Sequence, residues 1–334
     1  MTDLSIIIVN HNSANLIIDC LRSVYQFTRW VNFEIIVVDN SNDTNKAEVL
    51  RQFSNVCWID MNYNAGFARA NNAGIRISKG EVVLLLNPDT IVIDNTIADC
   101  YNRLQQTNYI AAGVQLLDIN NQPQISGSFF VKGGLNHLLP IPYWGSFIRW
   151  LGYKTKRKIP NVQKAKDVEE VDWISGAFLM VKKQAIENAG LLNEDFFLYA
   201  EEVEWCSRLK KAGKLCIFGN LHIIHLEGAT INKSENLEEK GYYNLYDKKG
   251  LQLMVSNHVR VRKQYGTGWF LILLLNFTLG LFIYFVCSFF YRLLTLKNPF
   301  KEWKKVAAFA NNVWKLWQLS PIIISNKPYF YKML

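Results

Sequence analysis

The chain has 334 residues, of which half are hydrophobic and 13% are aromatic. This composition excludes an intrinsically disordered protein and supports one large α/β domain with an accessory segment. The net charge of +9 is uneven, because residues 1–239 carry 23 Lys and Arg against 26 Asp and Glu, whereas residues 240–334 carry 14 against 2. The basic segment is also the most apolar part of the chain, so we expect it to contact an anionic membrane surface and no nucleic acid.

The six cysteines include no CxxC pair, which indicates neither a zinc site nor a disulfide framework. The first residues, MTDLSIIIVNHN, lack the charged region and cleavage site of a signal peptide. We therefore expect the main domain to be cytosolic and to contain free thiols.

Short β-branched runs alternate with helical patterns through the first 120 residues. Buried strands are predicted at 5–9, 34–38, 56–60 and 81–86, and helices at 14–27, 66–78 and 94–105. This alternation predicts a doubly wound, mostly parallel sheet that binds ligands at the carboxyl ends of its strands. Polar residues stand at three of those ends, namely Asn10-His11-Asn12, Asp39-Asn40-Ser41 and Asn87-Pro88-Asp89-Thr90.

The middle of the chain is less regular. Residues 123–166 contain four prolines, a glycine pair and several aromatic residues, so we expect an irregular loop region that contacts an acceptor. A strand, turn and second strand are predicted at 168–183, a helix at 201–213, and a strand and loop at 215–228.

Residues 268–290 read GWFLILLLNFTLGLFIYFVCSFF, an uncharged run of 23 residues that is long enough for a transmembrane helix. Positive charges flank both of its ends, so the positive-inside rule selects no orientation. A re-entrant or interfacial helix is an alternative to a single span, and a buried soluble helix is a third. Residues 300–317 predict an amphipathic, basic, tryptophan-rich helix suited to a membrane surface.

Several strand-end residues have both a functional and a structural interpretation. Asp89 is placed to hold Mg²⁺ together with phosphate oxygens, or to cap the next helix with Thr90. Asp39 can accept a hydrogen bond from a nucleobase or ribose, or form an Asx-turn. His225 is a candidate metal or phosphate ligand, or a structural histidine.

A glycine-initiated helix is predicted after Asn64. Its N-terminus and Arg69 together suit a diphosphate. No GxGxxG motif follows the first strand, so a dinucleotide-binding Rossmann site is disfavoured.

Three acids begin the helix predicted at 201–213. Helical spacing places Glu202 on the face of Trp205 and Leu209, and pairs Glu204 with Arg208 as an ordinary surface ion pair. A carboxylate at a helix start that is directed toward the apolar side is suited to general base catalysis. The alternative is that the acids only complement the helix dipole.

The ordered series IIIVNHN, VVDNSND, NYNAGFARANN, LLLNPDT, VDWISGAFLMVKK, FFLYAEEVEWCSR and HLEG resembles family 2 glycosyltransferases of the GT-A fold. The resemblance is greatest to the rhamnosyltransferase-like branch that builds bacterial cell-surface polysaccharides, and it spans roughly residues 3–265. It implies a catalytic domain over 1–265, with a nucleotide-binding half (1–120) and an acceptor-binding half (121–265). Residues 266–334 would then be a membrane-association segment.

The resemblance implies roles for individual residues. Those that match positions contacting the nucleotide sugar are Asn10, Asn12, Asp39, Asn64, Gly66, Phe67, Arg69, Asn71, Asn87 and Asp89. Asp172 and Trp173 match a position near the donor sugar and acceptor. Asp89 matches the last acid of the family's DxD-type motif for Mg²⁺ or Mn²⁺, with Asn87 in place of the first acid, and His225 matches a histidine near the metal or diphosphate.

The catalytic base matches Glu202, with Glu201 beside it, although the family usually has aspartate at this position. The implied reaction is an inverting transfer from a nucleotide diphospho-sugar, with dTDP-rhamnose favoured over UDP-hexose or furanose donors. The implied acceptor is a polyprenyl-diphosphate-linked saccharide at the cytoplasmic face of the inner membrane. A sugar-nucleotide nucleotidyltransferase should have a glycine-rich loop with an arginine after the first strand, and NHNSANL contains neither residue type, so this class is disfavoured. An inactive membrane-bound binding module is disfavoured because it would tolerate loss of Asp89 and Glu202, and both acids are present.

Overall fold

The computed structural model describes residues 2–41, 46–154, 161–226 and 244–334. The chain forms two compact units. Unit 1 comprises Met1–Phe129, Asn161–Glu194 and Glu201–Glu239, and unit 2 comprises Phe130–Pro160, Asp195–Ala200 and Lys240–Leu334. The chain passes between the units more than once, so neither unit is a single sequence segment. The boundary expected at residue 265 separates two functions, whereas these units are defined by their internal contacts. The functional boundary therefore stays a prediction.

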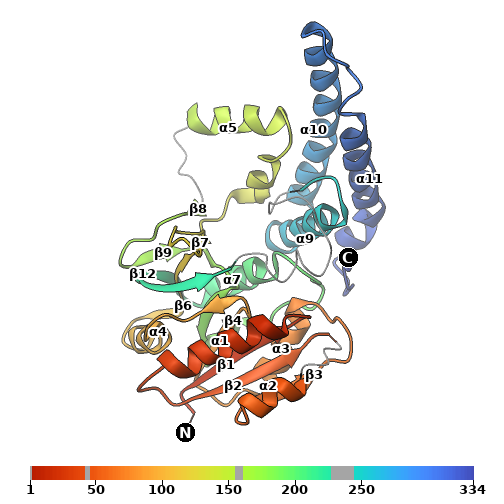
Figure 1. Cartoon of the computed structure of the whole chain (residues 1–334). Coiled ribbons are helices and arrows are strands. Elements are labelled where there is room, and N and C mark those ends of the chain that lie inside the picture. Colours follow the sequence, from red (N-terminus) through yellow and green to blue (C-terminus); the bar gives the residue numbers. More distant parts are fainter. Residues whose placement is uncertain (1, 42–45, 155–160, 227–243) are drawn as a thin grey trace. The chain divides into compact units, whose positions relative to one another are not determined.

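A mixed β-sheet forms the centre of unit 1 (Figure 1). Its strands lie in the order β3-β2-β1-β4-β11-β6-β12-β5, and β9 pairs with β12. The first four strands in this order are parallel, β11 is antiparallel to both of its neighbours, and β6 is parallel to β12. The strand bounds are β1(Leu4–Asn10), β2(Phe33–Asp39), β3(Cys57–Asp60), β4(Val82–Leu86), β5(Thr90–Ile91), β6(Tyr109–Leu117), β9(Glu169–Val171), β11(Phe178–Lys182) and β12(Lys214–His225).

Helices cover both faces of this sheet (Figure 1). One face packs against α1(Ala14–Phe27) and α4(Thr96–Gln105), and the other packs against α3(Phe67–Ile77), α6(Lys183–Ala189) and α7(Glu201–Ala212). α2(Lys46–Gln52) follows β2. All seven residues of β1 are buried, as expected for a parallel strand that is covered on both sides. The predicted doubly wound α/β architecture is confirmed, as a mixed sheet with a parallel N-terminal half.

A smaller sheet of β7(Gly127–Ser128), β8(Asn161–Val162) and β10(Trp173–Ile174) completes unit 1. The region 123–166 was expected to be an irregular loop region. This expectation is wrong for the part of the region that belongs to unit 2. There, residues of the region form η1(Lys132–Leu138) and the eleven-residue helix α5(Trp144–Lys154). The left-handed Gly133 within η1 must be glycine, because a Cβ atom there would collide with the ring of Trp269.

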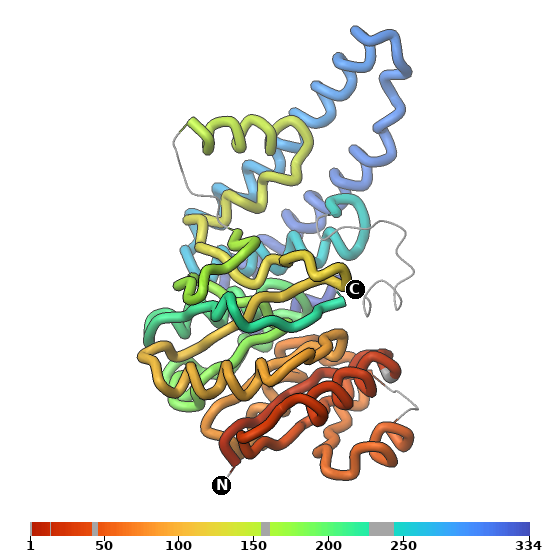
Figure 2. The backbone as a smooth tube through the Cα atoms, turned by 60° about the vertical axis from the view of Figure 1, so that its left-hand side comes forward, coloured from red at the N-terminus to blue at the C-terminus, as the bar shows by residue number. Residues whose placement is uncertain are grey.

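Unit 2 is built around α9(Lys248–Tyr265), most of which is buried. It continues into α10(Thr267–Leu294) and α11(Trp303–Ser325), which lie side by side and antiparallel (Figures 1 and 2). Phe277 of α10 contacts Phe309 of α11 edge to face, and Nε1 of Trp317 donates to Oγ1 of Thr278 at 3.0 Å. Within the described part of the chain, α10 has the length and apolar composition of a membrane-crossing helix. The amphipathic helix predicted at 300–317 is present as α11.

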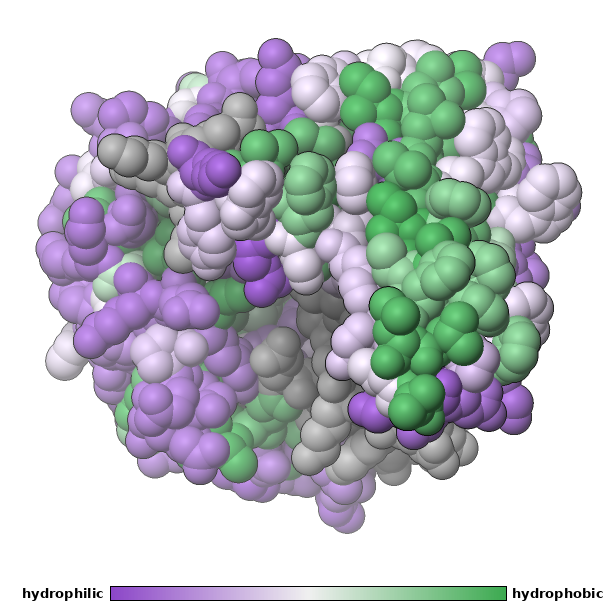
Figure 3. Space-filling model, turned by 90° about the horizontal axis from the view of Figure 1, so that it is seen from above, coloured by the Kyte–Doolittle hydropathy of each residue, from purple (hydrophilic) through white to green (hydrophobic). Residues whose placement is uncertain are grey.

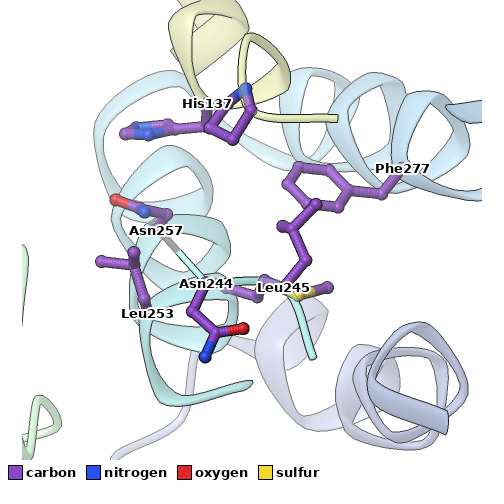
Figure 4. A pocket seen from close by; sticks show the side chains of 8 residues that line it. His137, Asn244, Leu245, Leu253, Asn257 and Phe277 are labelled. Carbon is purple, nitrogen blue, oxygen red and sulfur yellow. The ribbon is translucent and has the colours of Figure 1, made fainter. Parts of the chain in front are cut away.

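A small pocket in unit 2 has polar and apolar walls (Figure 4). His137 and Asn257 contribute polar groups, whereas Leu253 and Phe277 contribute apolar ones. Nε2 of His137 accepts a hydrogen bond from Arg260 at 2.8 Å, and burial lowers the pKa of His137 well below its usual value. The imidazole is therefore neutral and serves to hold the buried arginine.

Candidate functional site

The carboxyl ends of β1 and β2 are joined by side-chain hydrogen bonds. Asn10 lies opposite Asp39 in the parallel ladder, and its Nδ2 donates to Oδ1 of Asp39 at 3.0 Å. The same oxygen accepts from the amide and hydroxyl of Ser41 at 3.3 and 2.8 Å, so the Asx-turn considered from sequence is present. Three donors therefore fix the orientation of a buried carboxylate at the strand end.

The loop after β1 is held against the loop after β2. The amide of Asn12 donates to Oγ of Ser41 at 3.3 Å, and Asn12 adopts the left-handed region with φ 51°. Nδ1 of His11 lies 3.1 Å from the carbonyl oxygen of Asn40. The side chains of His11 and Asn12, which are half-exposed and exposed, therefore lie near the fixed Asp39 carboxylate.

Asn40 connects β2 to the turn that begins α3. Its Oδ1 accepts from the amide of Ala65 at 2.7 Å, and its Nδ2 donates to Oδ1 of Asn64 at 3.2 Å. Oδ1 of Asn64 also accepts from the amide of Gly66 at 3.1 Å, and Gly66 has φ 81°, which favours glycine. These bonds place the N-terminus of α3 at the same sheet edge as Asn10 and Asp39.

Side chains in the first turns of α3 form hydrogen bonds to the backbone. Nδ2 of Asn71 donates to the carbonyl of Phe67 at 2.9 Å, and Nε of Arg69 donates to the carbonyl of Glu194 at 3.2 Å. Asn72 forms a closed pair with the backbone of Leu192, with bonds of 2.9 and 3.0 Å. α3 therefore fixes the loop that precedes α7, and a role for Arg69 toward a diphosphate stays a prediction.

Asp89 and His225 are brought together by the antiparallel pairing of β5 with β12. Thr90 lies opposite His225 in this ladder, and the amide of Leu226 donates to the carbonyl of Asp89 at 2.9 Å. Nε2 of His225 lies 3.5 Å from Oδ1 of Asp89, and both side chains are largely buried. Asp89 does not cap α4, because the N-cap of that helix is Asn95.

Gln124 determines which nitrogen of His225 carries the proton. Its Nε2 donates to the carbonyl of His225 at 3.0 Å, and its Oε1 lies 2.9 Å from Nδ1 of the ring. Since the first bond sets the orientation of the amide, Nδ1 is the donor in the second, and the neutral ring has its lone pair on Nε2.

The facing atoms suit a cation. Among the described residues, Oδ1 of Asp89 has no hydrogen-bond partner although it is buried. A carboxylate oxygen and an imidazole lone pair thus face each other, which is a chemically suitable donor set for a divalent metal. The described ranges contain no group of three or more His, Cys, Asp or Glu side chains that could hold a metal. Within these ranges the two side chains leave coordination positions for a bound molecule or water.

Glu202 and Phe67 both lie close to Gly176. A Cβ atom added at Gly176 would lie 3.6 Å from Cγ of Glu202 and 3.5 Å from the Phe67 ring. The next carbonyl along the chain, that of Ala177, accepts from the amide of Asn87 at 3.0 Å. The turn before β11 therefore links the start of α7 and the start of α3 to the loop that contains Asp89.

The three acids of α7 differ in a way that helical spacing did not predict. Glu201 is 3% exposed and Glu204 is 5% exposed, whereas Glu202 is half-buried. Glu204 does pair with Arg208, through bonds of 2.9 Å from Nε and Nη2, but the expected surface location is wrong. Arg208 also donates to the carbonyls of Ala189 and Leu191, so this ion pair anchors the loop before α7.

Asp172 forms an ion pair with Lys210 of α7, and its amide donates to the carbonyl of Ser128 at 2.9 Å. The adjacent Trp173 lies opposite Ser128 in the small sheet and is half-buried. A role for Asp172 and Trp173 at the donor sugar or acceptor stays a prediction.

The cysteines near these residues are chemically inert. Burial raises the pKa of Cys20, which lies beside Thr90, to about 12, and burial likewise raises the pKa of Cys206 on α7 to about 12. Neither thiol forms a thiolate near neutral pH, so thiolate catalysis is excluded at both positions.

Three residues of this region were given no individual role from the sequence. Asn40 and Asn72 stand next to predicted site residues, so their positions in VVDN and ARANN were the available signal. Gln124 lies in an apparently irregular stretch, and nothing local distinguishes it. Glu227 and Gly228 of the HLEG motif lie outside the described residues.

Residues 5–134 match the family described as "Glycosyl transferase family 2". The chain carries a glycosyltransferase family 2 domain. This match confirms the family resemblance of the sequence motifs. Its matched range contains the Asn10, Asp39 and Asp89 strand ends, but not α7 or His225.

Curated relatives extend beyond the matched domain. The low-salt glycan biosynthesis hexosyltransferase Agl10 of Haloferax volcanii is 31% identical over 63% of this chain and 62% of its own length. The dTDP-rhamnosyl transferase RfbF of Shigella flexneri is 26% identical over 68% of this chain and 73% of its own length. The N-acetylglucosaminyl-diphospho-decaprenol L-rhamnosyltransferase of Mycobacterium tuberculosis is 24% identical over 55% of this chain and 63% of its own length. The chain thus spans less than two thirds of the first and third relatives.

A solved structure shares the fold of this chain. The mannosyltransferase PcManGT from Pyrobaculum calidifontis, in complex with GDP-Man and Mn²⁺, superposes with a TM-score of 0.53 over 95% of this chain and 86% of its own. The sequence identity is 13%, so the likeness concerns the fold alone. It confirms the GT-A-like fold expected from the sequence.

Proposed function

We propose that the protein is an inverting glycosyltransferase that moves a sugar from a nucleotide diphospho-sugar to a hydroxyl group of a saccharide acceptor. The observation that carries the proposal is the pairing of Asp89 with His225 at the carboxyl end of the sheet. In the same unit, Glu202 lies beside Gly176, and the next residue, Ala177, bonds the amide of Asn87 in the loop that contains Asp89. A metal-binding pair and a carboxylate base connected to one loop are what such a transfer requires.

We propose that the nucleotide is held at the ends of β1 and β2. Asn10 orients the carboxylate of Asp39 toward the ribose or base, and the Asn40–Asn64 contact positions the N-terminus of α3. Free amides at a helix N-terminus favour a diphosphate. Asn12, Gly66, Phe67, Asn71 and Asn87 complete the proposed binding surface.

Asp89 and His225 would hold Mg²⁺ or Mn²⁺, with diphosphate oxygens as the remaining ligands. A bound metal would neutralise the charge that develops on the leaving diphosphate. Glu202 accepts the proton of the acceptor hydroxyl as that oxygen attacks the anomeric carbon. In the same step the bond from the sugar to the diphosphate breaks, and its bonding pair leaves with the phosphate oxygen.

Glu202 is favoured over Glu201 as the base because its side chain is more exposed and lies beside Gly176 and Phe67. Asp172 and Trp173 are proposed to contact the donor sugar or acceptor from the small sheet. Phe67 offers an apolar surface against which a sugar ring can pack.

For the substrates, we propose dTDP-rhamnose as donor and a polyprenyl-diphosphate-linked saccharide as acceptor. The names of the Shigella and Mycobacterium relatives support this choice, whereas the name of the Haloferax relative supports transfer of a hexose. A UDP-hexose donor is therefore the alternative. A lipid-linked acceptor would be reached from the cytoplasmic membrane face, where the apolar helices of unit 2 would hold the enzyme.

A panel of nucleotide sugars tests the function. The full chain, with Mg²⁺ or Mn²⁺, is incubated with dTDP-rhamnose, UDP-hexoses and furanose donors, with and without a polyprenyl-diphosphate-linked acceptor. We expect release of the nucleoside diphosphate from one donor class, increased by the acceptor, and a product with inverted anomeric configuration. Absence of nucleotide release with every donor, from folded protein, would contradict a transferase function.

A second expected result concerns Gln124, which we propose holds His225 in the metal-binding tautomer. Gln124→Leu removes both hydrogen bonds to His225, and we expect metal-dependent binding of the nucleoside diphosphate to weaken by about 10-fold or more. Isothermal titration calorimetry with and without Mn²⁺ measures the effect. Gln122→Leu is the matched control, because Gln122 is exposed and its side chain bonds the carbonyl of Asn120 in its own turn. Equal affinities of Gln124→Leu and the parent protein would show that His225 needs no such support.

A further inference from the structure

The α10–α11 hairpin begins and ends at the same place in unit 2. α10 follows α9 directly, and both Nε and Nη2 of Arg262 on α9 donate to the carbonyl of Ile324 near the end of α11, at 3.2 and 2.9 Å. Beyond α11, Gln252 of α9 bonds the carbonyl of Tyr331 at 3.0 Å and the amide of Met333 at 2.8 Å. The C-terminal segment after α11 therefore returns to the helix from which the hairpin departs.

This closure restricts how the hairpin can meet a membrane. With 28 residues, α10 is about 42 Å long and could cross a bilayer. Because the chain returns, a crossing by α10 would require a second crossing by α11. In the described part of the chain α10 alone has the composition for crossing, whereas α11 has the exposed Lys315 near its middle and Lys304 and Lys305 near its start. A single span with the C-terminus on the far side is incompatible with this arrangement.

The outer face of α10 is nevertheless as apolar as the face that packs inside unit 2. Exposed side chains recur at helical spacing along it, namely Leu271, Leu275, Leu279, Phe282 and Phe290. Figure 3 shows a continuous hydrophobic band on the side where Figure 1 places α10. A surface helix in water would be polar on its outer face. The apolar band therefore needs a covering.

A second apolar surface comes from α5, which the sequence did not predict. Trp144, Phe147 and Trp150 stack along this helix with ring centroids 5.4 and 5.8 Å apart. Phe147 is 48% exposed and Trp150 is 50% exposed. The base of α5 is attached to α10, because Ile141 and Trp144 close over Gly280. Hence α5 extends the apolar surface of the hairpin.

Basic residues border these surfaces. Lys297, Lys301 and Lys304 are exposed around the turn between α10 and α11, and Nζ of Lys154 lies 4.1 Å from the ring of Trp150. Exposed Trp303 and Trp314 accompany the lysines on α11. Tryptophan and lysine beside an apolar band are typical of the interface of an anionic bilayer.

We propose that unit 2 is a monotopic membrane module, in which α5, the outer face of α10 and the lysine-rich turn lie in one leaflet and no segment crosses the bilayer. The occupant of the apolar face is the acyl region of an anionic membrane. The inference rests on the proposed membrane location, but it does not depend on the transfer reaction. It resolves the choice between a single span and an interfacial helix in favour of the latter.

Vesicle flotation tests the surface. The full chain is mixed with phosphatidylcholine vesicles with or without phosphatidylglycerol. We expect Phe147→Ser/Trp150→Ser to reduce vesicle affinity by about ten-fold, since two large apolar side chains lose their burial. The control is Trp30→Ser, which removes an 89% exposed tryptophan of unit 1. Equal losses in both variants would overturn the α5 assignment, as would a change in oligomeric state with unchanged flotation, which would assign the face to a second copy.

Charge reversal tests the lysine border in the same assay. Lys297→Glu/Lys301→Glu/Lys304→Glu should lose most of the binding that phosphatidylglycerol adds. The matched triple variant, Lys79→Glu/Lys164→Glu/Lys211→Glu, changes exposed lysines of unit 1 and should bind as the parent does. A parental response to phosphatidylglycerol in the first variant would contradict the proposed border.

Cysteine labelling tests the topology. In a Cys57→Ser/Cys287→Ala background the four remaining thiols are buried, which leaves them unreactive. Lys301→Cys reports the hairpin turn and Lys327→Cys reports its base. In host cells we expect an impermeant maleimide to label both positions in inverted membrane vesicles and neither in spheroplasts. Labelling of Lys301→Cys alone in spheroplasts would show that the hairpin crosses. Absence of the protein from membranes would instead contradict the proposed location.

Discussion

Glu202→Gln is expected to reduce sugar transfer by two to four orders of magnitude, the range by which a positioned general base accelerates proton transfer. The amide has the size of the carboxylate but cannot accept the acceptor's proton. Since Glu202 lies beside Gly176 and Phe67 without forming the core, the fold should persist. Initial rates with saturating donor and acceptor measure the loss.

Donor binding separates a catalytic role from a binding role. Calorimetric titration of Glu202→Gln with the nucleotide sugar should give an affinity within about two-fold of the parent, because the carboxylate acts on the acceptor hydroxyl. Glu201→Gln is the matched comparison, as it alters the adjacent and more deeply buried acid. If Glu202→Gln retains most of the turnover while Glu201→Gln loses it, the base is Glu201. Glu202→Asp asks in addition whether the shorter side chain, usual in the family, reaches the hydroxyl.

Asp89→Asn should abolish the effect of Mg²⁺ or Mn²⁺ on nucleoside diphosphate binding and reduce transfer by at least about 100-fold. The substitution preserves the shape of the side chain in a buried position, but it removes the charge that faces Nε2 of His225 at 3.5 Å. Titrations with and without the metal provide a readout that is independent of turnover.

The control for Asp89→Asn is Asp19→Asn, which neutralises an exposed aspartate on α1 that forms an ion pair with Arg22. It should titrate as the parent does in either condition. An undiminished metal response in Asp89→Asn would show that the metal is held elsewhere. The proposed donor site at Asp39 would remain, because its hydrogen bonds involve none of the Asp89 atoms.

Local patterns predicted the strands and most of the helices of unit 1 well. A buried parallel strand appears as an unbroken apolar run, so β1, β2 and β4 were visible in IIIV, IIVV and VVLLL. α5 was missed because prolines and glycines surround it and its aromatic residues face outward. The predicted surface location of Glu204 was also wrong. Helical spacing identifies Arg208 as its partner, but it does not reveal that Arg208 also bonds the carbonyls of Ala189 and Leu191 in the loop before α7.

The sequence by itself determined the class of fold, the polar residues at the strand ends and the apolar, basic character of the C-terminal segment. These features depend on residue type and on spacing within one element. Only the tertiary structure decided that Gln124 holds His225, that Asn72 fixes the loop before α7, and that α11 returns to α9. Such contacts join residues 101 and 120 positions apart in the first two cases, so no local periodicity records them. They arise from the order in which strands and helices pack.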